Sequence, residues 1–191
     1  KRGMVAQPND GSKSYAMSAY AVFARIPTVE HNTDDSEVSK TFDLVLENFD
    51  SSKLNVAFGW TSNDEHAFTA SVTASNGMVH ASDFLYNLEV FSQLPPYEGE
   101  DRPQKFNGTT SSQSVHTVAF VVSDGDNMQI LQNDFVSSTH WNSPQRGVEA
   151  IGWSYAPSMA VLMPSLLSYT IRTSTAKDSL SSGPSGIGYA Y

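Results

Sequence analysis

The most chemically suggestive part of the sequence is residues 123–127, Ser-Asp-Gly-Asp-Asn. Asp124 and Asp126 stand one residue apart around a glycine, and two carboxylates so placed can act as an acid and a base or bind a hard cation. The segment does not match an EF-hand loop, because Met128 stands where that loop needs an oxygen ligand. The structural alternative is that one aspartate caps a helix starting near Asn127 and the other is solvated.

An acid and two aromatic residues are further candidates. Glu65 is the candidate partner for the aspartate pair, although the helix dipole also favours a glutamate in a first helical turn. Trp60 and Trp153 could stack on the apolar face of a sugar ring, but large aromatic residues at strand ends often belong to the core. Asp83 and Asn87 could bind hydroxyl groups or serve as turn and cap residues.

No motif points to a metal, nucleotide or serine-hydrolase site. The five histidines lack H-E-x-x-H spacing, and the G-x-S-x-G, G-x-x-x-x-G-K-[ST] and G-x-G-x-x-G patterns are absent. The chain has no cysteine, which removes disulfides, thiolate zinc sites, cysteine nucleophiles and iron–sulfur clusters. We therefore predict neither a bound metal nor a cofactor.

Helical and strand periods alternate along the chain. The apolar stripe from Val38 to Phe49, preceded by cap residues Asp34–Ser36, predicts a helix, and the alternation in Leu54–Phe58 predicts a strand. The β-branched run Val115–Val122 is the predicted central strand, covered on both faces. The same patterns predict helices near 64–74, 128–135 and 164–171 and strands at 78–81 and 148–153. The alternation predicts an α/β fold with a parallel sheet, either open and doubly wound or closed into a barrel.

The candidate site residues share a position, because they follow the predicted strands. In parallel α/β folds the carboxyl ends of the strands lie on one side, where their side chains converge. The residues that this rule brings together are Trp60, Glu65, Asp83, Asn87, Asp124, Asp126, Asn127, Trp153 and Tyr155.

Composition excludes several classes of partner. The 191 residues form one domain or part of one, and 20 acidic against 11 basic residues give a net charge of −9. The lack of a Lys/Arg cluster argues against nucleic acid and against an anionic membrane surface. The longest apolar runs, such as Val118–Val122 and Met159–Met163, are too short to span a bilayer. A neutral or cationic partner fits better.

The last residues carry a distinctive motif. Gly186, Gly188, Tyr189 and Tyr191 fit the pattern G-x-G-Y-x-Y. This motif resembles the one that names the GxGYxYP family, whose members are described as proposed glycoside hydrolases. The turn at 124–127 is also similar to that family's pattern. Further residues that match the family pattern in the same order are Phe58-Gly59-Trp60, Glu65, Gly77, Ser82-Asp83, Asn87-Leu88, Gly152-Trp153 and Asp178.

The resemblance implies a TIM-barrel-like (β/α) domain that processes carbohydrate, usually in exported bacterial proteins. We expect residues 1–191 to form a single barrel domain, incomplete because the chain looks like a fragment, with residues 1–19 as a linker or domain edge. An extracellular or periplasmic location is expected from the same resemblance. The resemblance supplies no catalytic pair.

The leading hypothesis is a glycoside hydrolase, which generally needs one carboxylic acid to protonate the leaving oxygen and a second carboxylate as nucleophile or base. The candidate catalytic residues are Asp124, Asp126 and Glu65. The candidate sugar-binding residues are Trp60, Asp83, Asn87, Asn127, Trp153, Tyr155, Asp178, Tyr189 and Tyr191. The alternatives are a non-catalytic carbohydrate-binding or surface protein, with Asp124 and Asp126 holding Ca²⁺ or capping, and a metal-dependent hydrolase. Carbohydrate is the expected partner, and the sequence does not tell which protein partners the chain has.

Overall fold

The computed structural model describes residues 3–7, 16–61, 63–82, 84–98, 116, 118–124, 127–183 and 185–191. Its first half contains β1 (Gly3–Gln7), α1 (Ser18–Ala24), β2 (Thr28–Glu30), α2 (Ser36–Glu47), β3 (Asn55–Gly59), α3 (Glu65–Ala74), β4 (Gly77–His80) and α4 (Leu88–Phe91). Its second half contains β5 (Val121–Val122), α5 (Met128–Asn133), β6 (Ile151–Tyr155), α6 (Met159–Leu162), α7 (Pro164–Thr173) and β7 (Asp178–Ser182). None of the helices in these ranges is long and apolar enough to cross a membrane.

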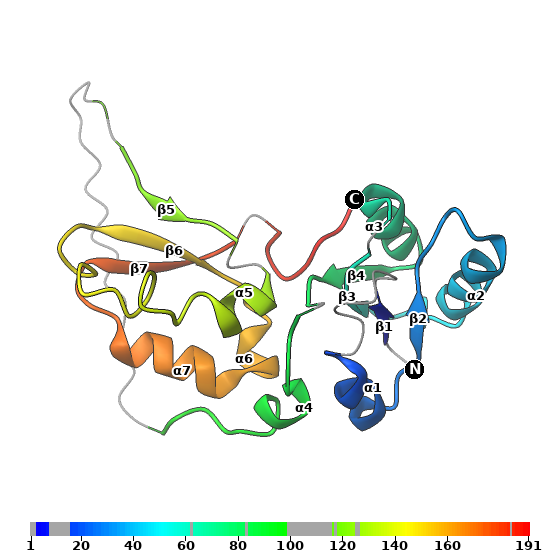
Figure 1. The fold of residues 1–191 in the computed structure, drawn as a ribbon, viewed down its shortest axis with the longest axis horizontal. Coiled ribbons are helices and arrows are strands. Elements are labelled where there is room, and N and C mark those ends of the chain that lie inside the picture. Colours follow the sequence, from blue (N-terminus) through cyan, green and yellow to red (C-terminus); the bar gives the residue numbers. More distant parts are fainter. Residues whose placement is uncertain are drawn as a thin grey trace.

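The first sheet has the strand order β2-β1-β3-β4, and each neighbouring pair is parallel (Figure 1). Val5 of β1 lies opposite Thr28 of β2 and Phe58 of β3, so β1 is an inner strand. Gly59 ends β3 at φ +99°, and a Cβ there would lie only 2.0 Å from the carbonyl oxygen of Ala6. Only glycine fits such a close approach between the two backbones.

The second sheet has the order β5-β6-β7 and is also parallel. Trp153 of β6 lies opposite Val122 of β5 and Leu180 of β7. Helix α5 lies on the chain between β5 and β6, and helices α6 and α7 lie between β6 and β7. Pro164 occupies the first turn of α7, where its missing N–H costs nothing.

The expected TIM-barrel-like fold is wrong. In a (β/α) barrel each strand is followed by a helix and the sheet closes on itself. Here β3 pairs with β1, β2 remains at an edge, and the described strands form two separate sheets of four and three strands. The predicted α/β class and parallel pairing are confirmed. The order of the first sheet is the one with which open, flavodoxin-like sheets begin.

The predicted central strand is also wrong. Of the described residues in Val115–Val122, only Val121 and Val122 form a strand, and β5 lies at the edge of its sheet. Val118 and Phe120 are 75% and 69% exposed. The apolar run indicates burial, but β5 is an edge strand that has a neighbouring strand, β6, on one side only.

Local caps explain the helices that follow β2 and β3. The Asp35 carboxylate accepts hydrogen bonds from the backbone N–H groups of Glu37 and Val38, at 2.9 and 3.2 Å, and so caps α2. The Asp64 carboxylate accepts from Ala67 N–H at 2.9 Å and caps α3. Each cap fixes where its helix begins, and therefore which side chains remain at the carboxyl end of the preceding strand.

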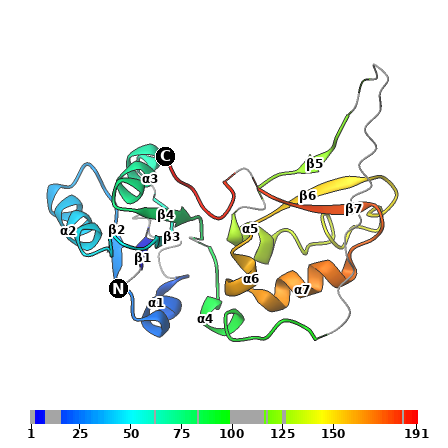
Figure 2. The same cartoon turned by 180° about the vertical axis from the view of Figure 1, so that it is seen from behind.

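The carboxyl ends of β4, β6 and β7 face the middle of the molecule (Figures 1 and 2). Figures 1 and 2 show β4 running toward the middle from one side and β6 and β7 from the other. One hydrophobic core joins the halves, because Phe58 of β3 packs in the same cluster as Met128 of α5 and Trp153 of β6. The backbone N–H of Met128 also donates to the carbonyl oxygen of Ala81, just after β4, at 3.2 Å.

Candidate functional site

Trp60 and Glu65 form a pair directly after β3. The indole N–H of Trp60 donates to Oε1 of Glu65 at 2.8 Å, and the Glu65 side chain is exposed at the first position of α3. In open α/β sheets, ligands bind outside the carboxyl ends at the point where the strand order reverses. In the first sheet this point lies between β1 and β3. The structure therefore places a fixed carboxylate and a half-buried ring at a position that suits a ligand.

Two tyrosines of the terminal motif lie beside this pair. The ring of Tyr189 meets that of Trp60 edge-on, with 5.2 Å between the ring centroids. The ring of Tyr191 meets that of His66 at 5.0 Å, and Tyr191 is 74% exposed. Of the predicted site residues, Trp60, Glu65 and Tyr189 are thus in one contact group, and the Tyr191 ring packs against His66 of α3, the helix that begins with Glu65.

The loops after β2 and β3 are joined by polar contacts. Nδ1 of buried His31 lies 3.0 Å from the hydroxyl oxygen of Thr61. The Thr33 hydroxyl donates to the side-chain oxygen of Asn63, and the Asn63 amide donates to the Asp34 carboxylate at 3.3 Å. Sequence reasoning missed His31 because the three-residue strand before it was not recognised.

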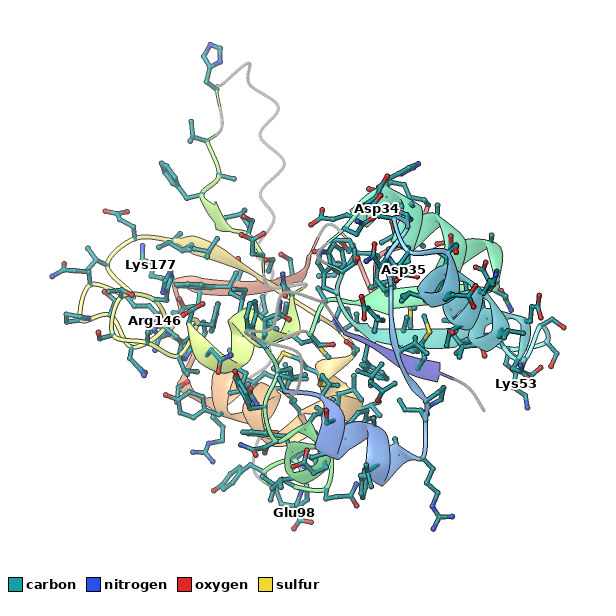
Figure 3. The ribbon with its side chains drawn as sticks, turned by 45° about the vertical axis from the view of Figure 1, so that its right-hand side comes forward. Asp34, Asp35, Lys53, Glu98, Arg146 and Lys177 are labelled. Carbon is teal, nitrogen blue, oxygen red and sulfur yellow. The ribbon has the colours of Figure 1, made fainter. Side chains whose placement is uncertain are left out.

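Two aspartates follow β2, and one lysine precedes β3. Figure 3 shows Asp34 and Asp35, which follow β2, well away from Lys53, which precedes β3. The same view places Lys53 and Lys177, which precedes β7, toward the two outer ends of the molecule. Burial lowers the pKa of His31, and the nearby negative charges of Asp64 and Asp43 oppose that shift.

The end of β4 carries two buried polar side chains. The Ser82 hydroxyl donates to the carbonyl oxygen of His80 at 2.8 Å and accepts from the Gly59 N–H at 2.6 Å, which ties β4 to β3. His80 is 2% exposed, its ring stacks on Phe58, and its Nδ1 has no hydrogen-bond partner among the described residues. Burial lowers the pKa of His80 to about 4. The sequence feature that could have marked His80 as a candidate is its position near the end of the predicted strand 78–81.

Asp124 and Asn127 lie where the second half meets β4. Asp124 is exposed, has φ +64°, and its carbonyl oxygen accepts from Asn127 N–H at 3.0 Å. Asn127 precedes α5, and its buried Oδ1 has no partner among the described residues. The Asn127 side chain makes no capping hydrogen bond to α5. Because Met128 contacts Ala81, the loop that carries Asp124 lies against the end of the first sheet.

Three other predicted residues give less information. Asp83 and Asp126 lie outside the residues that the structure describes. Asn87 is exposed, has φ +57° and precedes α4 without a side-chain cap. Asp124 and Glu65 follow strands of different sheets.

Trp153 and Asp178 contact each other inside the second half. The Trp153 indole donates to one Asp178 oxygen at 2.8 Å, while Thr175 N–H and the Arg146 guanidinium donate to the other. Burial acts to raise the pKa of Asp178, but these hydrogen bonds and the Arg146 charge together hold it below its usual 3.8. Both side chains are buried and engaged within the protein.

Tyr155 is also buried. Its hydroxyl oxygen lies 2.7 Å from that of Thr170 on α7, and burial raises its pKa. The structure therefore brings Trp60, Glu65, Tyr189 and Tyr191 to the first sheet, leaves Asp124 and Asn127 at the junction, and encloses Trp153, Tyr155 and Asp178 in the core of the second half.

A pocket of about 450 Å³ lies at the other end of the first sheet. Its lining includes Gly3 at the start of β1, Pro27 just before β2, and Leu44 and Phe49. Among the residues that the structure describes, no acid or histidine lines it. It therefore lacks groups for acid–base chemistry. In the described ranges, no three or more acidic or histidine side chains gather as a metal site would require.

Comparisons with known proteins agree with the terminal motif. Residues 114–191 match the family model described as "GxGYxYP putative glycoside hydrolase C-terminal domain", and residues 3–93 match the one described as "GxGYxYP third domain". No curated protein matches the chain. A solved structure described as "a putative hydrolase from Bacteroides thetaiotaomicron VPI-5482" is 21% identical, with a TM-score of 0.79 over 100% of this chain.

That likeness shows a shared fold. The chain spans only 36% of the length of the Bacteroides protein. The first sheet lies in the range of the third-domain match, and the second sheet and the terminal motif lie in that of the C-terminal match. The chain belongs to the GxGYxYP family and contains its third and C-terminal domains.

Proposed function

We propose that the protein is a glycoside hydrolase that binds its glycan at the carboxyl end of the first sheet, next to the junction with the second. The family name supports this class of reaction. The observation that carries the proposal is the pair formed by Trp60 and Glu65, because it sets an exposed carboxylate beside an aromatic ring where the strand order reverses. Aromatic rings offer an apolar face to a sugar, and hydrolysis needs a carboxylate close to it.

Glu65 is the proposed nucleophile or base. Its Oε1 accepts a hydrogen bond from the Trp60 N–H at 2.8 Å. Its Oε2 has no hydrogen-bond partner among the described residues. One oxygen is thus held in place while the other is available to a sugar carbon or a water.

Asp124 and Asp126 are the candidates for the second carboxyl group. Asp124 is exposed on a loop that lies against the end of β4, because the next helix begins with the contact of Met128 to Ala81. A left-handed backbone at Asp124 is tolerated by Asp and Asn better than by most residues. Asp124→Asn therefore changes the charge without straining the loop.

The experiment is a glycan screen with the full-length protein. Wild type is expected to release reducing sugar from at least one glycan, and Asp124→Asn or Asp126→Asn to reduce that rate by about 10²-fold or more. Asp134→Asn, at the exposed end of α5, is the control and should keep the wild-type rate. Glycan binding with no turnover in wild type would contradict the proposal and favour a carbohydrate-binding protein.

A further inference from the structure

The terminal segment belongs to the second half of the chain but ends on the first sheet (Figure 1). It leaves the end of β7, where Gly183 N–H donates to the carbonyl oxygen of Tyr155 at 3.1 Å. It then forms an antiparallel bridge with β4: Val79 N–H donates to Tyr189 O at 2.9 Å, and Tyr189 N–H donates to Val79 O at 2.8 Å. The bridge covers the edge of β4, which would otherwise present unpaired backbone groups.

The two glycines of the motif make this bridge possible. Gly186 adopts φ +58°, in the left-handed region that glycine enters without strain. Gly188 passes so close to β4 that a Cβ would lie 3.0 Å from Sδ of Met78 and 3.1 Å from the carbonyl oxygen of Val79. The spacing G-x-G-Y thus provides a turn, a close approach and then the residue that pairs with β4.

The tyrosines then contact Trp60 and the helix that begins with Glu65. The Tyr189 ring contacts Trp60, which also contacts Phe68 on α3, with 6.1 Å between those ring centroids. Tyr191 N–H donates to the Thr73 hydroxyl at 3.1 Å, and the Tyr191 ring contacts His66. Thr73 and His66 belong to α3, the helix that begins with Glu65. The motif therefore contacts the ring that holds the carboxylate and the helix that carries it.

We propose that Tyr189 is a positioning residue, which fixes the Trp60 ring and through it the direction of the Glu65 carboxylate. This proposal rests on the proposed function, in which Glu65 takes part in the reaction. The motif that names the family then acts as a clamp between its C-terminal and third domains. Tyr189 contributes to turnover through Trp60, not by touching the reacting atoms.

The test uses the full-length protein labelled with 5-fluorotryptophan, with the Trp60 resonance assigned by its loss in Trp60→Phe. Tyr189→Ala removes the ring, and Tyr189→Leu is a second variant that keeps apolar volume if alanine prevents folding. Tyr189→Phe keeps the ring. Ile187→Ala is the control, because Ile187 lies in the same segment and is 51% exposed.

Loss of the ring should shift the ¹⁹F resonance of Trp60 and lower kcat by about 10²-fold, the effect of misplacing a reacting group by about 1 Å, while KM changes little. Phenylalanine should restore both, and Ile187→Ala should alter neither. An unmoved resonance, or an unchanged kcat, in Tyr189→Ala or Tyr189→Leu would overturn the proposal. If wild type cleaves no glycan, the proposed function fails, but an unmoved resonance would still overturn the clamp separately.

Discussion

The indole N–H of Trp153 donates to the carboxylate of Asp178 across 2.8 Å, between β6 and the first residue of β7. The same carboxylate pairs with Arg146, whose side chain is 14% exposed. Asp178→Asn should lower the free energy of unfolding by about 3 kcal/mol, because it leaves the guanidinium of Arg146 poorly solvated and without a counter-charge. Urea unfolding at pH 7 measures this.

Glu149→Gln serves as the control for this variant, because Glu149 is exposed in the same half of the chain. Exposed substitutions of this kind change stability by less than about 0.5 kcal/mol. The pKa of Asp178 is lowered, so its contribution to wild-type stability should be present above about pH 4 and lost as the pH falls further. Equal unfolding midpoints for the two variants at pH 7 would show that the ion pair contributes nothing.

His80 should make the free energy of unfolding depend on pH in the mildly acidic range. Its pKa falls from 6.5 to about 4 on burial, so the unfolded chain binds a proton between these values while the folded chain does not. Stability is therefore full above pH 6.5 and falls by about 3 kcal/mol as the pH drops to 4. Urea unfolding at pH 7 and 4.5 measures the change.

His80→Leu should lose much of this dependence, since leucine takes up no proton. Burial also lowers the pKa of His31, so part of the dependence remains in the variant and in wild type alike. The account of His80 fails if both proteins lose the same free energy between pH 7 and 4.5.

Replacing Gly186, Gly188 or Gly59 by alanine should lower the free energy of unfolding by different amounts. In Gly186→Ala no atom lies within 4 Å of the new Cβ, so only the φ of +58° is unfavourable. The free energy of unfolding should fall by about 1 kcal/mol. Gly188→Ala should cost more, because Met78 must move. Gly59→Ala should cost above about 3 kcal/mol or prevent folding, since its Cβ would lie 2.0 Å from Ala6 O. Thermal unfolding of the three variants gives the order, and a Gly59→Ala protein as stable as Gly186→Ala would contradict it.

Local patterns predicted the helices after β2 and β3 well. The stripe from Val38 to Phe49 and its acidic caps correspond to α2, with Phe42 and Leu46 buried and Asp35 as the cap. The predicted helix 64–74 corresponds to α3, and Asn76, just after it, has φ +57°, as expected for a helix stop. These features depend on residues near one another in sequence.

Features that depend on distant residues could not be read in this way. The run Val115–Val122 indicates burial, but it does not say which strand lies beside it or whether both edges are paired. Likewise, alternating strands and helices predict parallel pairing, yet nothing in that pattern places β3 beside β1. The family resemblance, and not the pattern of the residues, is what favours a closed barrel over an open sheet.

The candidate site shows the same limit. A carboxylate and an indole five residues apart could be placed together, and Trp60 and Glu65 do form a hydrogen bond. Trp153 is buried in the second half, where its indole donates to Asp178, a residue 25 positions away in the sequence. Asp178 in turn pairs with Arg146, which is 32 positions away. The pairing of Tyr189 with Val79 had no sequence signal.

The expected extracellular or periplasmic location of the protein stays a prediction.

The central claim is that Glu65 acts in glycoside cleavage. The measurement is kcat of the full-length protein on the glycan that it cleaves, for wild type, Glu65→Gln and Glu47→Gln. Glu47 is the matched control, an exposed glutamate at the far end of α2. We predict that Glu65→Gln lowers kcat by about 10²–10⁴-fold while Glu47→Gln retains it. A Glu65→Gln protein that turns over at the wild-type rate would contradict the account.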